Sequence, residues 1–422
     1  MIFLRRSGTG PPLLLLCISC FLACADSPSV DDGAYTALEG GTVYVFADEA
    51  PLRDGVVLIE GMRIREVGEA GSVRLPGGTT VIDVHGFTVL PGFWNSHAHL
   101  TETKWEGGDT LPPARLTELM REMFTRYGFV HVYDIASFGE QTLALRSRLQ
   151  QADVAAPDVL TTMEPFVPPD GTPRYVESLE LPELHDPAAA RDSVRARVAR
   201  GSDGIKLFTV PLTRRRPFPV MPLEVVEAVT DEAHREGLMV FAHPSNREGV
   251  EVATTGGVDV LAHSAPMGGE LPASLLDEMS RRSVALIPTL TLWEDDYGAD
   301  TTGMRAFVRA GQEQVRAYAT RGGRILFGTD VGYLTRYDPT REYELMAEAG
   351  LSFVEILRSL TSAPSEQFGH AERTGRIAPG FDANLVVIAG DPLQDIRALA
   401  HIHLTMKRGR VLFHAAESNS QR

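Results

Sequence analysis

The centre of the chain, from about residue 91 to residue 370, alternates short β-rich runs with helical patterns. The β-rich runs are Val89–Asn95, Phe129–Ala136, Val159–Met163, Gly204–Val210, Leu238–His243, Val258–His263, Val284–Pro288 and Arg324–Phe327. Helical patterns between them include Pro187–Arg200, Leu223–Glu236, Arg247–Thr255 and Met304–Arg321. Such alternation predicts an α/β fold with a parallel sheet. Eight strands are the number that closes a (β/α)8 TIM barrel, and a doubly wound open sheet is the alternative.

Short strands with glycine turns are predicted on both sides of this central region. They are Thr42–Phe46, Val56–Glu60, Arg63–Val67 and Thr80–Val84 before it, and Asn384–Ala389, Ile402–Lys407 and Arg410–His414 after it. A tight hairpin at Gly61-Met62 joins the second and third strands. Because so few strands bury little on their own, we expect residues 35–90 and 371–416 to form one small β-sandwich. It would flank a barrel of residues 91–370.

The N-terminus has the pattern of an export signal. Arg5 and Arg6 precede an apolar run from Leu13 to Ala23, which is too short to span a bilayer and has the length of a signal-peptide core. The sequence Phe21-Leu22-Ala23-Cys24 resembles a bacterial lipoprotein signal, in which the cysteine is lipidated after cleavage. Plain secretion and twin-arginine export are the alternatives.

We therefore expect residues 1–23 to be a signal peptide and residues 24–34 a flexible tether. The mature protein would be periplasmic or in the cell envelope, and would reach the membrane only through a lipid on Cys24. All three cysteines, Cys17, Cys20 and Cys24, lie in this leader. The mature chain therefore has no thiolate metal site, and any metal must be bound by histidines and carboxylates.

The formal net charge of −16 argues against nucleic-acid binding, which needs clustered lysine and arginine. A small-molecule substrate is the expected partner, and the sequence leaves the oligomeric state open.

Ionisable side chains lie at or near the ends of the predicted central strands. They are His97, His99, Lys206, His243, His263 and Asp330. In a barrel the strand C-termini open onto one mouth, so these residues would converge. His97 and His99 are two apart on a strand and can face one ion. Each histidine alone is more often structural, but the set predicts a metal site. By its local pattern alone, Lys206 faces the helix layer, because a cation near metals is unfavourable.

With these residues in place, the sequence resembles the metal-dependent amidohydrolase superfamily, in particular its secreted prolidase-like and imidazolonepropionase-like members. The matching stretches are Leu90-Pro91-Gly92-Phe93, His97-Ala98-His99-Leu100, Gly204-Ile205-Lys206, Ala242-His243, the segment from Gly257 to His263, Gly328-Thr329-Asp330 and the segment from Gly375 to Leu385. The resemblance covers nearly all of the mature chain. It implies a metal-bearing barrel with a flanking β-sandwich.

The resemblance also implies a role for each ionisable residue. His97, His99 and Asp330 would bind a first metal, and His243 and His263 a second. Lys206 would be carboxylated by CO2 and bridge both ions, which removes the objection to its charge. The metal in this family is usually Zn2+, which suits nitrogen and oxygen ligands, although nothing in the chain enforces zinc over manganese or cobalt.

Three stretches depart from the family pattern, and none of them contains an expected ligand. The family commonly has aspartate where Asn95 or Ser96 precedes the histidine pair. Many relatives have small residues where Pro244-Ser245-Asn246 lies, and Asn384 replaces a frequent aspartate.

The implied reaction is hydrolysis of an amide-type C–N bond by a metal-bridging hydroxide, in a dipeptide, an N-acyl amino acid or a cyclic amide. Asp330 would act as general base and then acid. Arg214 could bind a substrate carboxylate, and Tyr133 and Tyr333 could donate to an oxyanion, although a surface or packing role is commoner for each.

Two other classes of function stay open. The first is a related enzyme: a mononuclear deaminase, a cyclic-imide hydrolase, a lactonase or an esterase, in which Lys206 would be unmodified. The second is a non-catalytic surface lipoprotein, against which the complete set of ligands argues.

Overall fold

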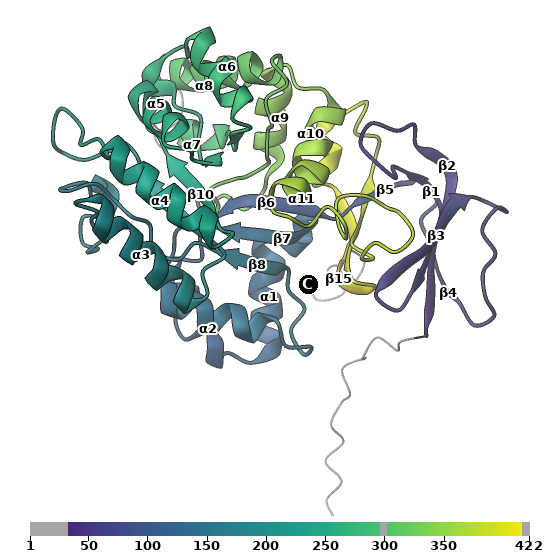
Figure 1. Ribbon diagram of the computed structural model, residues 1–422. Coiled ribbons are helices and arrows are strands. Elements are labelled where there is room, and N and C mark those ends of the chain that lie inside the picture. Colours follow the sequence, from purple (N-terminus) through teal and green to yellow (C-terminus); the bar gives the residue numbers. More distant parts are fainter. Residues whose placement is uncertain (1–32, 296–301, 416–422) are drawn as a thin grey trace, which may run out of the picture.

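The computed structural model describes residues 33–295 and 302–415. The predicted signal peptide, Cys24 and most of the predicted tether lie outside these ranges. Figure 1 shows a central group of strands with helices around it and a β-rich layer, built from both ends of the chain, beside it. The chain therefore has the α/β architecture that the sequence predicted.

The central strands form two parallel sheets, ordered β6-β7-β8 and β12-β11-β10-β9. Their bounds are β6 (Phe93–Ala98), β7 (Phe129–Asp134), β8 (Asp158–Thr161), β9 (Gly204–Phe208), β10 (Met239–His243), β11 (Val260–Leu261) and β12 (Ala285–Leu286). Every residue of β6, β7 and β9 is buried. Such continuous burial is typical of parallel strands with helices on their outer face.

Backbone hydrogen bonds also connect the edges of the two sheets. They run from Phe166 to Lys206 (2.8 Å), from Phe208 to Phe166 (2.9 Å), from Leu286 to Arg324 (2.9 Å) and from Ser96 to Phe327 (2.8 Å), in each case from amide to carbonyl. The predicted strand Arg324–Phe327 is reduced to one isolated bridge, between Ile325 and Leu286. This segment nevertheless lies between β12 and β6, and the arrangement is consistent with the predicted barrel.

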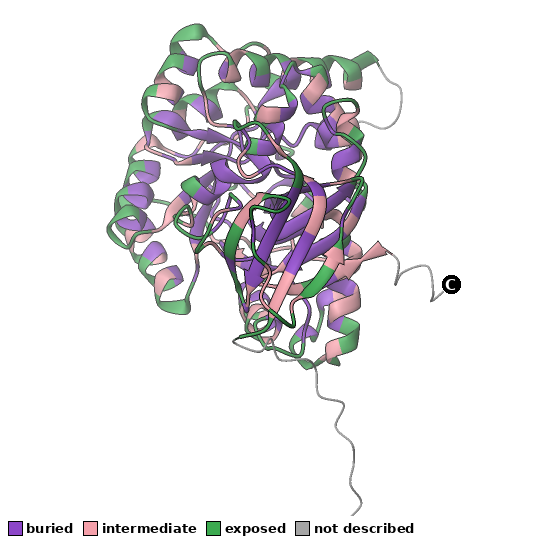
Figure 2. Cartoon of the chain, turned by 90° about the vertical axis from the view of Figure 1, so that its right-hand side faces the viewer, coloured by how far each residue is buried: buried purple, intermediate pink, exposed green. Residues whose placement is uncertain are grey.

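Helices cover the outside of the central strands, and Figure 2 shows exposed residues mainly on their outer faces. The α-helices are α1 (Pro113–Met123), α2 (Gly139–Leu149), α3 (Pro187–Arg200), α4 (Leu223–Arg235), α5 (Arg247–Thr255), α6 (Ala273–Arg281), α7 (Leu290–Asp295), α8 (Thr302–Ala319), α9 (Thr340–Glu348), α10 (Phe353–Leu360) and α11 (Ser362–Gln367). Short 3-10 turns are η1 (Thr103–Trp105), η2 (Gly108–Thr110), η3 (Thr125–Tyr127), η4 (Arg174–Val176), η5 (Pro266–Gly268) and η6 (Ile396–Ala400). Local sequence sets some of these bounds: Asp186 caps α3 by accepting from the amides of Ala188 and Ala189.

The flanking layer is one eight-stranded sheet, ordered β15-β14-β13-β5-β1-β2-β3, with β4 paired to β1. Its strands are β1 (Tyr35–Val43), β2 (Leu52–Glu60), β3 (Arg63–Glu69), β4 (Thr80–Asp83), β5 (Phe87–Pro91), β13 (Leu385–Ala389), β14 (Ile402–Lys407) and β15 (Arg410–His414). The predicted hairpin at Gly61-Met62 is confirmed. Both chain ends contribute, as predicted, but the expected sandwich is a single hydrogen-bonded sheet. One buried cluster, which includes Leu38, Val57 and Val387, joins the two ends.

Two predicted strands near the N-terminus have the wrong bounds. The strand predicted at Thr42–Phe46 begins at Tyr35 and ends at Val43, because irregular pairing with β2 around Gly41 carries the strand past two glycines. The strand predicted at Val89–Asn95 is divided at Gly92 into β5, which pairs with β13, and β6, which pairs with β7. The proposed domain division at residues 90 and 370 stays a prediction.

Among residues 33–295 and 302–415, no helix is both long and apolar enough to span a bilayer.

Candidate metal centre

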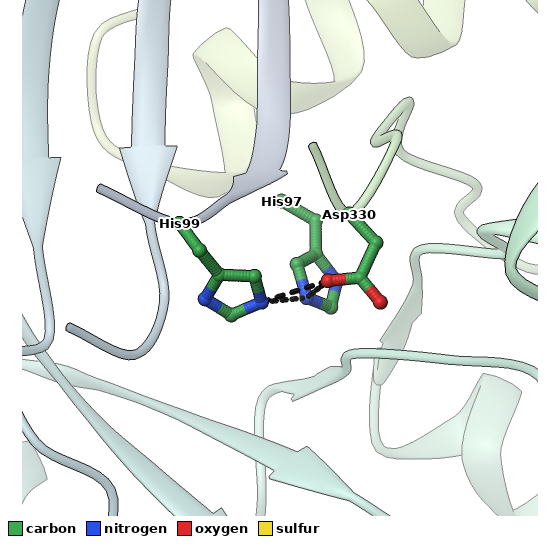
Figure 3. A group of neighbouring side chains, drawn as sticks. All are labelled: His97, His99 and Asp330. Atoms are coloured by element: carbon green, nitrogen blue, oxygen red, sulfur yellow. Dashed lines mark hydrogen bonds and ion pairs between the residues drawn. The ribbon is translucent and has the colours of Figure 1, made fainter. Parts of the chain in front are cut away.

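Three predicted ligands meet at the C-terminal end of β6. His97 lies on β6, His99 directly follows this strand, and Asp330 follows the segment that lies between β12 and β6. The Nε2 atoms of His97 and His99 are 3.2 Å apart. They lie 3.2 Å and 2.7 Å from Oδ1 of Asp330, respectively. Figure 3 shows both rings directed at this oxygen. One ligand atom from each residue therefore lies within 4.8 Å of the others.

Backbone carbonyls fix the orientation of both imidazoles. Nδ1 of His97 lies 2.8 Å from the carbonyl oxygen of Ala262, and Nδ1 of His99 lies 2.8 Å from that of Ala136. A ring nitrogen facing a carbonyl must carry the proton, so in a neutral ring Nε2 keeps its lone pair. Two imidazole lone pairs and a carboxylate oxygen therefore face one another. Such a group of acceptors needs a cation between them, and this fits a metal ion.

The burial and the charges of Asp330, His97 and His99 also fit a bound cation. Oδ1 of Asp330 is buried and accepts no hydrogen bond. Burial opposes a charge on Asp330, but the neighbouring histidines outweigh it and hold the pKa of this carboxyl well below its usual range. Burial lowers the pKa of His97 to about 4. For His99 burial acts in the same direction, yet Asp330 outweighs it and raises the pKa.

His243 and His263, at the ends of β10 and β11, lie beside this group. The ring centroid of His263 is 4.6 Å from those of His97 and His243. Nδ1 of His263 lies 2.7 Å from the hydroxyl of Thr289, which itself donates to the carbonyl of Pro288 and so accepts from the ring. Nε2 of His263 is then left as the ligand atom. Burial lowers the pKa of both histidines well below the usual value, so both are neutral, as metal ligands must be.

Lys206 lies on β9 and lines the same pocket as the four histidines and Asp330. Its side chain is only 2% exposed and lines the pocket, whereas its local pattern alone suggested that it faces the helix layer. Burial lowers the pKa of its amine to about 7. A large part of this amine is therefore neutral, and nucleophilic, near neutral pH.

The pocket has a volume of about 430 Å3 and contains all six predicted ligands together with Tyr333. Tyr333 packs against Tyr175, with ring centroids 5.2 Å apart. The structure does not bring the other two predicted substrate contacts here. The hydroxyl of Tyr133 donates to the carbonyl of Asp203, which directly precedes β9 and so lies at the end of this strand away from the pocket. Arg214 is exposed and forms an ion pair with Glu177.

Sequence reasoning missed Asp134, at the end of β7. Its buried carboxylate accepts hydrogen bonds from the amide of Leu100 and the hydroxyls of Ser137 and Thr161. It thereby holds the backbone next to His99. Its position at a strand end is the same signal that identified the metal ligands, and could have found it.

The amidohydrolase family model matches residues 88–412. An uncharacterized Mycobacterium tuberculosis protein is 28% identical over 253 residues, covering 56% of this chain and 65% of that protein. The chain thus spans slightly less than two thirds of the length of this relative. Aspergillus niger ochratoxinase is 21% identical over 420 residues, covering 87% of this chain and 84% of its own.

Solved structures share the fold over a greater length. A Xaa-Pro dipeptidase with bound methionine superposes with a TM-score of 0.77 at 19% identity, covering 90% of this chain and 99% of its own. The structure of A. niger ochratoxinase gives a TM-score of 0.75 at 18% identity, covering 91% and 96%. At these identities, the likeness establishes a common α/β fold.

Proposed function

The chain belongs to the amidohydrolase family, whose members are hydrolases acting on carbon–nitrogen bonds, and on this premise we propose that it hydrolyses an amide-type C–N bond of a small molecule with bound divalent metal. The observation that carries the proposal is the convergence of His97, His99 and Asp330. Their three acceptor atoms lie within 4.8 Å of one another, and the buried carboxylate oxygen among them has no hydrogen-bond donor.

Two ions are the form of the site that we propose. His97, His99 and Asp330 would hold one, and His243 and His263 the other. Lys206, carboxylated by CO2, would bind both, since its neutral amine can react with CO2 and the product is an anion. The nitrogen and oxygen donors of these ligands suit Zn2+. Bound divalent ions lower the pKa of water and polarise a carbonyl.

The side chains of the pocket have distinct roles in this proposal. One oxygen of Asp330 lies between the imidazoles, and the second points away from them (Figure 3). The carboxylate is ionised, so it can accept a proton from the attacking water and pass it to the leaving nitrogen. Tyr333 lines the pocket, and we assign to its hydroxyl the donation of a hydrogen bond to the oxyanion of the tetrahedral intermediate.

The size of the pocket limits the substrate. About 430 Å3 suits a small molecule, such as a dipeptide, an N-acyl amino acid or a cyclic amide. One of the similar solved structures is that of a Xaa-Pro dipeptidase, and this activity agrees with an amide-type substrate.

The same proposal includes a closed (β/α)8 barrel around this pocket, supported by the backbone hydrogen bonds at both edges of the parallel sheets. Export through the N-terminal segment, with a lipid on Cys24, remains part of the proposal on the sequence pattern alone.

A mononuclear hydrolase is the second candidate. The observation in its favour is that, among the residues that the structure describes, only His97, His99 and Asp330 form a tight group of possible ligands. In this case Lys206 would stay unmodified, and removing its amine would leave the metal count unchanged.

Metal-stripped protein, reconstituted with Zn2+ in buffer with or without bicarbonate, separates the two candidates. We expect about two metal equivalents per chain and hydrolysis of N-acyl amino acids or their amides, both dependent on bicarbonate. Lys206→Ala should lose most of the activity and the second equivalent while retaining the melting temperature of the ion-free chain. One equivalent, with turnover unaffected by this substitution, would contradict the binuclear proposal.

A further inference from the structure

Five aromatic side chains from different elements surround the pocket. They are Phe138, Tyr175, Phe208, Trp293 and Tyr333. Two of the rings are held by partners: the indole of Trp293 donates to the hydroxyl of Ser264 at 2.9 Å, and Phe208 packs on His243 with centroids 4.7 Å apart. Aliphatic residues, including Leu179 and Leu292, fill the spaces between them. The pocket next to the metal ligands therefore has an apolar and largely fixed wall.

Lysine and arginine side chains are scarce around this wall. Within residues 33–295 and 302–415, the pocket has two carboxylates besides Asp330, those of Glu164 and Glu180, and Lys206 is its only lysine or arginine. Once Lys206 is a metal ligand, no lysine or arginine of the pocket within the described ranges is left to pair with a substrate anion.

Nearby arginines already have partners. Arg197, which is buried, lies 2.5 Å from Glu164 and also donates to its carbonyl. Arg214 forms an ion pair with Glu177, and Arg215 with Asp170, in positions that are largely exposed. Exposed pairs of this kind are screened by water and contribute little to binding a ligand inside the pocket.

We infer that the preferred substrate is an uncharged amide with apolar groups on both sides of the scissile bond, and that the pocket discriminates against a free carboxylate next to that bond. This inference rests on the proposed amide hydrolysis and narrows it. Apart from the metal ions, which would bind the water and the scissile carbonyl, a substrate carboxylate entering here would meet aromatic faces and no lysine or arginine partner among the described residues, and losing its hydration there is unfavourable. An aromatic or branched neutral group would instead bury its surface against the wall.

Matched substrates test the inference in the metal-loaded enzyme. We would compare N-acetyl-L-phenylalanine with its neutral methylamide, which differ in charge, by measuring the initial rate of acetate release, because cleavage of the N-acetyl bond gives acetate from both compounds. The expected kcat/KM is higher for the methylamide by at least about tenfold. Equal or better hydrolysis of the acid would overturn the inference and leave the proposed function intact. Hydrolysis of neither compound, nor of other amides, would contradict the proposed function itself.

A charge introduced into the wall gives a second test. Leu179 is half-buried and lines the pocket, so Leu179→Arg places a guanidinium within it and Leu179→Gln is the uncharged control. We expect the ratio of kcat/KM for acid to that for methylamide to rise about tenfold in the arginine variant only. Arg214→Ala should leave this ratio unchanged. A selective loss of acid hydrolysis in Arg214→Ala would show that this exposed arginine binds the carboxylate, and would overturn the inference.

Discussion

At the scale of single residues, the candidate centre depends on groups that hold the ligands as much as on the ligands. The hydroxyl of Thr289 is the clearest case, because it donates to the carbonyl of Pro288 and must therefore accept from Nδ1 of His263. This hydrogen bond fixes the tautomer and the direction of the ring. Nothing near Thr289 in the sequence marks it as a partner of a histidine 26 residues earlier.

Replacing Thr289 with valine keeps its shape and removes the acceptor. We expect the affinity of the centre for Zn2+ to fall about 10- to 100-fold, as is usual when a partner of a metal-binding histidine is lost. Titration against a competing chelator measures this change. Thr289→Ser, which keeps the hydroxyl, is the control and should bind metal almost as well as the parent. Equal affinities in all three proteins would mean that Thr289 does not orient His263.

At the scale of elements, close contact between backbones sets the distance between ligands. Gly328, two residues before Asp330, lies against β6 and the segment after β12. A Cβ added at Gly328 would lie 2.6 Å from Cβ of His97 and 2.5 Å from Cγ2 of Ile287. Both contacts are shorter than side-chain carbons tolerate, so only glycine lets this segment lie so near β6.

Gly328→Ala should therefore push His97 out of place. We expect a loss of about 1–3 kcal/mol in the free energy of unfolding, typical of overpacking, together with weaker metal binding. Gly77→Ala is a suitable control, since a Cβ at Gly77 meets nothing within 4 Å. Urea denaturation of the ion-free chains and metal titration check both effects. If the two alanine variants behave alike, the close packing at Gly328 is not what positions His97.

At the scale of the whole molecule, the flanking sheet and the parallel strands meet around His131 of β7. Its ring stacks on Trp94 at 4.3 Å, its Nε2 lies 3.1 Å from the side-chain amide of Asn384, and Nδ1 lies 3.5 Å from Asp158. Burial lowers the pKa of His131 to about 3, although Asp158 opposes the shift. An uncharged ring thus lies at the junction between the parallel strands and the C-terminal part of the flanking layer.

This junction predicts a dependence of stability on pH. Between pH 6.5 and about 3 the unfolded chain binds a proton at His131 that the folded chain does not, so stability falls as the pH falls. The slope from this residue approaches about 1.4 kcal/mol per pH unit. His131→Gln keeps an acceptor for Asn384 and removes the titration. The urea midpoint of the ion-free variant should therefore decline less than that of the parent between pH 7 and pH 5, and parallel declines would contradict the assignment.

Local sequence by itself determined the order of strands and helices, the hairpin at Gly61-Met62 and the residues at the strand ends. These features follow from interactions over a few residues: the periods of strand and helix, the conformational freedom of glycine and the spacing of His97 and His99. The family resemblance added the expectation that six of these side chains form one centre.

Only the tertiary structure decided which side chains reach the pocket. It placed Tyr133 and Arg214 elsewhere and brought Phe138, Trp293 and Thr289 to the site. It also divided the predicted strand Val89–Asn95 between two sheets. The physical reason is that these outcomes depend on hydrogen bonds and packing between segments far apart in sequence. The residue pattern within one strand or helix does not specify which distant segment will pack against it, or at which of its faces or ends.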